Sequence, residues 1–129
     1  MKILQIIPEL LVEDMSKTVC FYKDKLGFKP EITFPEKDPI FVQVGRDDIH
    51  IMLYGRSEFE REIPKLKKAK MGGTVLLYIK ARKIKDFYKR INKGVTIIQQ
   101  LHKTEYGSVE FTIEDCNGYL ICFSESISE

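Results

Sequence analysis

Three ionisable side chains and one thiol are the residues of this chain whose chemistry could serve a binding or catalytic site. Glu9 and Glu110 are carboxylates that would favour a cationic or hydrogen-bond-donating ligand if the fold partly buried them. His50 is suited to general-base chemistry near neutral pH. Cys122 would act as a nucleophile only if a neighbouring cation lowered its pKa, and the sequence shows no such cation.

Each of these side chains also has a purely structural interpretation. His50 is explained as well by a hydrogen-bonded residue within a sheet, and Cys122 by a small packing residue. Glu9 fits a solvent-exposed carboxylate at a frayed strand, and Glu110 fits an exposed strand residue. The choice depends on the elements that position these residues and on the faces to which they belong.

Overall charge and composition narrow the kinds of partner. The chain has 129 residues and a nearly balanced net charge of +2, whereas nucleic-acid binding requires a clustered basic face. The basic run from Lys65 to Lys70 is interpreted as a solvated connector. No apolar run approaches the length of a membrane span. We therefore expect a small-molecule partner, with neither nucleic acid nor membrane.

The cysteines indicate the compartment. Cys20, Cys116 and Cys122 are odd in number and fit no zinc-binding spacing. The simplest account is a reduced protein in the cytoplasm. Pro8 and Glu9 interrupt the short apolar start of the chain, which also lacks a small-residue cleavage site, so no signal peptide is predicted.

The first half of the sequence predicts a strand, a helix and three further strands. Residues 3–12 form the first strand, and the helix begins at Asp14 or Ser16 and stops at Gly27. The helix places Cys20 in the core. Its apolar stripe, at three- and four-residue steps, consists of Met15, Val19, Tyr22 and Leu26.

The same order of elements returns in the second half. A strand from Thr74, a helix ended by Gly94 and three strands follow, and the tripeptide Phe21-Tyr22-Lys23 recurs as Phe87-Tyr88-Lys89. The repeat predicts an α+β protein of two tandem βαβββ units. Their bounds are residues 1–54 and 74–129, with a charged connector at 55–73, within one structural domain overall. The open sheet faces would enclose a cleft suited to a small molecule.

Two segments resemble the vicinal oxygen chelate superfamily, which includes glyoxalase I, extradiol dioxygenases, fosfomycin-resistance enzymes and bleomycin-resistance proteins. The segment "PELLVEDMSKTVCFYKDKLGF" (Pro8 to Phe28) is similar to the family's strand–helix opening, with its Phe-Tyr and Leu-Gly-Phe. The segment "EDCNGYLICFSE" (Glu114 to Glu125) resembles its "DPDGN"-type turn and final strand, with Cys116 in place of the usual proline. The resemblance implies a glyoxalase/bleomycin-resistance-type cleft within one chain or between two, and a homodimer.

The resemblance also implies where the metal-dependent members hold their ion. Their ligand positions fall on Ile7, His50, Thr74 and Cys122 of this sequence. Ile7 cannot ligate and Thr74 is a poor neutral ligand, so only two capable side chains remain. We therefore expect no metal and no cofactor. This expectation depends on strand register, because a one-residue slip exchanges the two faces of a strand.

Strand alternation predicts which side chains line the cleft. Residues that alternate with aliphatic core positions point to the opposite face of each strand. Tyr54 and Tyr78 could stack on a planar ligand or serve as ordinary amphipathic sheet residues. The predicted ligand-binding set is Glu9, His50, Met52, Tyr54, Thr74, Leu76, Tyr78, Glu110, Thr112, Cys122 and Ser124.

Three functions are compatible with this cleft. The favoured one is a small-molecule-binding protein that lacks the usual metal ligands and binds a planar or cationic ligand, although its mildly basic charge departs from the acidic drug-sequestering members. The second is a metal-dependent lyase, isomerase or dioxygenase of the glyoxalase type. The third is a metal-free enzyme with His50 as its general base.

Overall fold

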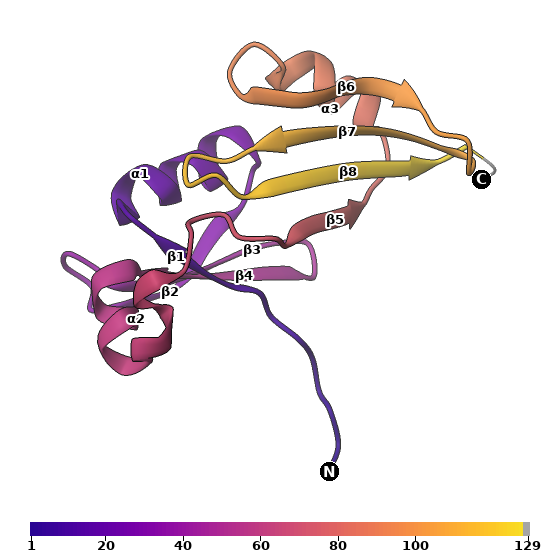
Figure 1. Cartoon of the computed structure of the whole chain (residues 1–129). Coiled ribbons are helices and arrows are strands. Elements are labelled where there is room, and N and C mark those ends of the chain that lie inside the picture. Colours follow the sequence, from indigo (N-terminus) through magenta and orange to yellow (C-terminus); the bar gives the residue numbers. More distant parts are fainter. Residues whose placement is uncertain (128–129) are drawn as a thin grey trace. The chain divides into compact units, whose positions relative to one another are not determined.

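The chain folds into two units, each built on one four-stranded sheet. The computed structural model describes residues 1–127, and its two compact units are Met1–Ala69 and Lys70–Glu129. Each unit has the element order strand, helix and three strands (Figure 1). The prediction of an α+β protein with two tandem βαβββ units is therefore confirmed.

The first unit, Met1–Ala69, holds a mixed sheet of strand order β1-β4-β3-β2, in which β1 runs parallel to β4 and the other pairs are antiparallel. Its strands are β1 (Glu9–Val12), β2 (Lys29–Phe34), β3 (Phe41–Arg46) and β4 (Ile49–Gly55). Its helices are α1 (Met15–Cys20), the π-helical turn η1 (Phe21–Lys25), α2 (Arg56–Glu62) and the 3₁₀ turn η2 (Pro64–Lys68).

The second unit, Lys70–Glu129, repeats this topology with the strand order β5-β8-β7-β6. Here β5 runs parallel to β8, and the other two pairs are antiparallel. Its elements are β5 (Leu76–Lys80), α3 (Ile84–Ile91), β6 (Thr96–Lys103), β7 (Ser108–Glu114) and β8 (Leu120–Ser126).

The start of α1 follows from Asp14. This residue has an extended backbone, and its side chain accepts a 3.0 Å hydrogen bond from the Lys17 amide, which satisfies one of the amides left unpaired at a helix start. The helix and its continuation bury Tyr22 and Leu26 completely, as the apolar stripe predicted. The expectation that Cys20 lies in the core is wrong, because Cys20 is exposed. It is two residues from the buried Tyr22, and this spacing puts it on the opposite side of the helix.

The core of the second unit is an aromatic and aliphatic layer between α3 and one sheet face. Phe87 packs edge-on against Phe123 at 5.2 Å between ring centroids, and Tyr88 packs against Phe111 at 5.0 Å. The start of α3 is fixed from β8, since the Glu125 carboxylate accepts hydrogen bonds from the Lys83 and Ile84 amides at 3.0 and 3.2 Å. The helix α3 is thus held to the sheet both by its aromatic side chains and by the hydrogen bonds at its first turn.

The first strand is shorter than predicted. Pairing with β4 begins at Glu9 rather than near residue 3, and the segment before it runs away from the sheet (Figure 1). Pro8 accepts a 2.9 Å hydrogen bond from the Met52 amide but has no amide hydrogen of its own to continue the ladder. The strand expected from Thr74 likewise begins later, at Leu76.

The segment expected to be a charged connector is more regular than the sequence suggested. It contains α2 and η2, and both belong to the first unit. Arg56 holds this region together by donating hydrogen bonds to Glu60 at 2.7 Å and to the Ala69 carbonyl at 2.7 Å. Across residues 1–127, no helix has the length and apolar character needed to cross a membrane.

Candidate functional site

The polar face of the second unit's sheet lies opposite α3. Along β7, Val109, Phe111 and Ile113 alternate with Glu110 and Thr112, and all of these residues are buried. The aromatic contacts of Phe111 with α3 assign the apolar set to the helix side. Glu110 and Thr112 therefore belong to the other face, because neighbours along a strand point in opposite directions.

Strand register gathers polar residues of three strands in rows across this face. Glu110 on β7 pairs with Ser124 on β8, and Ser124 pairs with Lys80 on β5. In the adjacent row, Cys122 on β8 lies between Thr112 and Tyr78. Four of the predicted ligand-binding residues, Tyr78, Glu110, Cys122 and Ser124, thus lie close together.

Glu110 is the centre of this cluster. Its carboxylate is buried, with the residue only 4% exposed. Tyr106 donates a hydrogen bond of 2.7 Å to Oε1. Ser108 and Ser124 donate to Oε2 at 2.9 and 2.8 Å, and the Tyr78 hydroxyl donates to the same oxygen. The Cys122 Sγ lies 3.8 Å from Oε1.

These bonds keep the carboxylate ionised. Burial raises the pKa of Glu110, but the hydroxyl hydrogen bonds outweigh burial and lower the pKa to about 2. The same contact raises the pKa of Tyr106 to about 12, since the hydrogen bond to Glu110 favours the protonated phenol. Within residues 1–127, no Lys, Arg or His forms an ion pair with Glu110. Within the described residues, the Glu110 carboxylate is therefore stabilised by hydroxyl hydrogen bonds and not by a direct ion pair.

The hydroxyl bonds also fix the polarity of the surrounding surface. A hydroxyl has a single proton to donate and two lone pairs. Tyr106, Ser108 and Ser124 donate to Glu110, and Tyr78 donates to Glu110 and lies 2.9 Å from Ser124 Oγ. Ser108 and Ser124 are buried, and Ser108 Oγ also contacts Thr104 Oγ1 at 2.9 Å. Tyr78 and Tyr106 are exposed, and their hydroxyls can only accept from a bound molecule while their protons are directed at Glu110.

A cavity of about 420 Å³ lies beside this cluster. The four hydroxyl residues line it together with Lys80 and Arg82, and further lining comes from Ala81, Gly107 and Ser126. All of these residues belong to the second unit. The volume lies within the range of small-molecule pockets, about 300–1,000 Å³.

Three predicted residues of the second unit, Thr74, Leu76 and Thr112, are not part of this cluster. Thr74 precedes β5 and is exposed, and Leu76 is exposed at the start of that strand. Thr112 is buried and donates a 3.3 Å hydrogen bond to Gln99. Burial raises the pKa of the Cys122 thiol, which keeps it protonated and opposes a role as nucleophile.

The predicted residues of the first unit form a separate set. His50 Nδ1 lies 2.8 Å from Glu31 Oε1, and Gln43 donates to the same oxygen at 3.2 Å. Tyr54 stacks on Phe59 at 4.7 Å, and a hydrogen bond to Glu62 raises the Tyr54 pKa. Met52, which pairs with Glu9, is half-buried. Burial raises the pKa of Glu9, and Glu62 adds to this effect.

The four positions that the resemblance predicts for metal ligands do not provide a fitting donor set. Ile7 is aliphatic, Thr74 is a neutral hydroxyl, His50 is held by Glu31, and the Cys122 thiol is protonated. Within residues 1–127, no group of three or more His, Cys, Asp or Glu residues is arranged to hold a metal ion. The side chains at these four positions therefore do not fit a catalytic metal ion.

Sequence reasoning missed seven residues of the pocket, four of which, Lys80, Arg82, Tyr106 and Ser108, carry the side chains suited to binding a ligand. Ser108 and Lys80 lie two residues from Glu110 and Tyr78 on the same strands, so alternation could have found both. Tyr106 and Arg82 lie outside regular strands. No periodic signal marks residues in such positions, because a turn rather than a pleat sets their direction.

Known proteins share this fold. The family model described as "Glyoxalase/Bleomycin resistance protein/Dioxygenase superfamily" matches residues 2–123. The chain belongs to this superfamily. A virulence protein from Salmonella typhimurium is 27% identical, with a TM-score of 0.73 over 98% of this chain and 99% of that one.

Two other solved structures with a similar fold are more distant in sequence. TnmS3, an antibiotic-binding protein from Streptomyces, is 17% identical with a TM-score of 0.71, covering 98% of this chain and 99% of its own. Lactoylglutathione lyase from Agrobacterium tumefaciens is also 17% identical, with a TM-score of 0.72 over 94% and 92% of the two chains. No curated protein matches the sequence. The superfamily fold thus occurs in both binding proteins and enzymes, so function has to be argued from the site.

Proposed function

We propose that this chain is a small-molecule-binding protein that works without a metal ion. It holds a cationic or hydrogen-bond-donating ligand in the cavity beside Glu110 that Tyr78, Tyr106, Ser108 and Ser124 line with Lys80 and Arg82, here called the Glu110 pocket. One observation carries the proposal. The buried, ionised Glu110 accepts hydrogen bonds from four surrounding hydroxyls, so the exposed Tyr78 and Tyr106 oxygens are left as acceptors for a bound molecule. An ammonium or planar N–H donor satisfies such a surface, whereas a carbonyl or carboxylate does not.

Two aromatic rings support a planar ligand. Tyr78 and Tyr106 both line the pocket, and both keep much of their ring surface exposed. Aromatic faces attract flat apolar groups and cations. An aromatic amine therefore matches both the polarity and the shape of the lining. The antibiotic-binding relative TnmS3 supports a binding role for this fold.

The experiment is calorimetric titration of the full chain with phenethylamine, an aromatic ammonium. We expect binding to the wild type and binding about tenfold weaker to Glu110→Gln, because the substitution removes the charge behind the hydroxyls. Tyr106→Phe, which keeps the ring and removes one acceptor oxygen, should weaken binding by a smaller factor. Glu105→Gln makes the same chemical change at an exposed neighbouring position and should bind like the wild type.

Equal affinity of the wild type, Glu110→Gln and Tyr106→Phe for phenethylamine would reject the proposal. Circular dichroism of each variant shows whether it is folded, and Tyr106→Phe provides the test if Glu110→Gln does not fold. Phenylpropionate, with a carboxylate in place of the ammonium, should bind no more weakly to Glu110→Gln than to the wild type, because the hydroxyls that donate to Glu110 have no proton to offer a carboxylate.

A metal-free enzyme with His50 as general base is the second candidate function. The 2.8 Å contact between His50 Nδ1 and Glu31 supports it, because a carboxylate on one ring nitrogen orients the other nitrogen as a base. Loss of a discovered turnover in His50→Gln, with binding at the Glu110 pocket intact, would favour this function.

A homodimer and a cytoplasmic location are part of the proposal. The outer strands β2 and β6 expose apolar side chains, including Ile32, Phe34 and Ile98, which supports contact with a second copy. A monomer mass in light scattering would reject the dimer. None of the three cysteines forms a disulfide, which is compatible with a reducing compartment.

A further inference from the structure

We infer that the Glu110 pocket selects a ligand with two opposite charges, an ammonium group at the hydroxyl cluster and an oxyanion at Lys80 and Arg82. This inference rests on the proposed binding function and names the chemical class of its ligand. Lys80 and Arg82 line the same pocket as the hydroxyl residues. The two ends of the pocket therefore differ in the charge that they attract.

The register of the sheet sets the separation between the two ends. Lys80, Ser124 and Glu110 are directly paired across β5, β8 and β7, so all three belong to one row on one face. Adjacent strands lie about 4.8 Å apart, which puts the backbones of Lys80 and Glu110 roughly 10 Å apart. A ligand lying across the strands meets the hydroxyl residues around Glu110 at one end and Lys80 and Arg82 at the other.

Neither cation at the rim is held in an ion pair by the chain. Within residues 1–127, neither Lys80 nor Arg82 forms an ion pair with a carboxylate. The nearby carboxylate of Glu125 accepts hydrogen bonds from the Lys83 and Ile84 amides at the start of α3, and these bonds, with smaller electrostatic contributions from Lys85 and Arg82, lower the pKa of Glu125. Two such cations beside a cavity attract an anionic group, and an arginine can bind either a carboxylate or a phosphate through two parallel hydrogen bonds.

The position of Ser124 between them also explains why Lys80 does not form an ion pair with Glu110. Ser124 stands between them in the ladder, and its hydroxyl donates to Glu110 at 2.8 Å. The opposite charges are thus kept apart, with a serine hydroxyl between them. A ligand with an ammonium at one end and an oxyanion at the other can contact the hydroxyl cluster and Lys80 at the same time, without movement of either strand.

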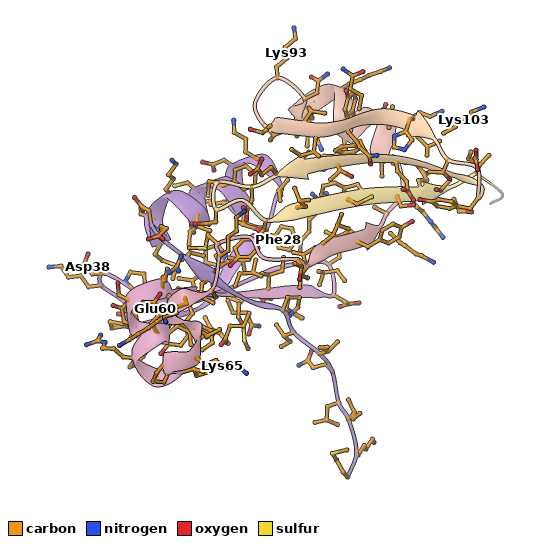
Figure 2. The ribbon with its side chains drawn as sticks, viewed as in Figure 1. Phe28, Asp38, Glu60, Lys65, Lys93 and Lys103 are labelled. Carbon is orange, nitrogen blue, oxygen red and sulfur yellow. The ribbon has the colours of Figure 1, made fainter. Side chains whose placement is uncertain are left out.

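The test compares phenethylamine with two derivatives that carry a carboxylate or a phosphate at the para position of the ring. Affinities are measured by calorimetry on the full chain, the double variant Lys80→Gln/Arg82→Gln and a control. The control is Lys93→Gln, because Lys93 lies in the turn after α3, points away from the sheet in Figure 2 and is not among the pocket residues.

We expect at least one para derivative to bind the wild type about tenfold more tightly than phenethylamine, the gain typical of two partly exposed ion pairs. The double variant should lose this gain and bind phenethylamine somewhat more tightly, since repulsion from the two cations is removed. Lys93→Gln should retain the wild-type gain. The derivative with the larger gain tells whether the anion is a carboxylate or a phosphate.

The outcomes separate this inference from the proposed function. If phenethylamine binds as tightly as both derivatives, the two-charge ligand is overturned and the binding of amines at Glu110 stands. A gain that persists in the double variant also overturns the role of Lys80 and Arg82. If phenylpropionate binds and phenethylamine does not, or if no probe binds at millimolar concentration, both proposals fail.

Discussion

Ser124 lies directly opposite Glu110 in the ladder between β7 and β8, and its hydroxyl donates a 2.8 Å hydrogen bond to Glu110 Oε2. The pairing is non-local, since the two residues are 14 positions apart in the chain. The buried carboxylate is therefore bonded directly to the neighbouring strand of the sheet. Changes at Glu110 should therefore affect both stability and binding.

Glu110→Gln should lower the free energy of unfolding by about 1–3 kcal/mol, the cost of leaving buried polar groups unsatisfied. In the wild type, hydroxyls donate to both carboxylate oxygens of Glu110, including those of Ser108 and Ser124. In the variant an NH₂ group replaces one of these oxygens, so at least one hydroxyl faces a second donor. Urea unfolding of the variant and the wild type measures the difference. Glu105→Gln, an exposed change of the same kind, should leave stability unaltered. Equal loss in both variants would contradict the role of the hydroxyl cluster.

Acid should destabilise the wild type more than Glu110→Gln. The folded pKa of Glu110 is depressed from 4.5 to about 2, so its stabilising contribution is complete above the unfolded pKa. That contribution is lost as pH falls from about 4.5 towards 2, where the folded carboxyl also takes up a proton. Thermal unfolding across this pH window should show the steeper decline in the wild type. Parallel curves for the two proteins would show that Glu110 is not held ionised.

Much of the fold was predictable because its signals are local. The apolar stripe of the first helix predicted the burial of Tyr22 and Leu26. Alternation along β7 correctly separated Phe111 and its apolar neighbours from Glu110. Both patterns depend on the fixed period of one element, which the sequence displays directly.

The features that escaped prediction depend on contacts between distant segments. The burial of Glu110 requires hydroxyls from β5, β7, β8 and the turn at Tyr106, and only the strand register brings these together. The first strand is short because Pro8 cannot donate to β4, although residues 3–7 have the apolar composition of a strand. Composition alone did not predict either result.

Cys122 should react more slowly with iodoacetamide than the other two cysteines. It is buried, and burial raises its thiol pKa, so little reactive thiolate forms at neutral pH. Cys20 and Cys116 are exposed. Mass spectrometry of the native protein after brief labelling should find Cys122 modified about tenfold less than either of the others. Labelling in denaturant is the control and should remove the difference, whereas equal native labelling would show that this sheet face is open.

The contact between His50 and Glu31 should be weak. Their side chains are 29% and 36% exposed, and ion pairs in contact with solvent contribute little to stability because water and salt screen them. A double-mutant cycle with His50→Gln and Glu31→Gln measures the coupling by urea unfolding. The hydrogen bond from His50 lowers the pKa of Glu31, so the coupling should be present above the unfolded pKa of Glu31 and fade as pH falls through its depressed folded value.

A matched cycle with His50→Gln and Glu36→Gln should give no coupling, because Glu36 is an exposed loop residue and no contact with His50 is formed. A coupling as large as that of a buried ion pair in the Glu31 cycle would instead indicate that water is excluded from the contact. That result would strengthen the case for His50 as an oriented base, since desolvation beside a carboxylate is the environment in which catalytic histidines are found.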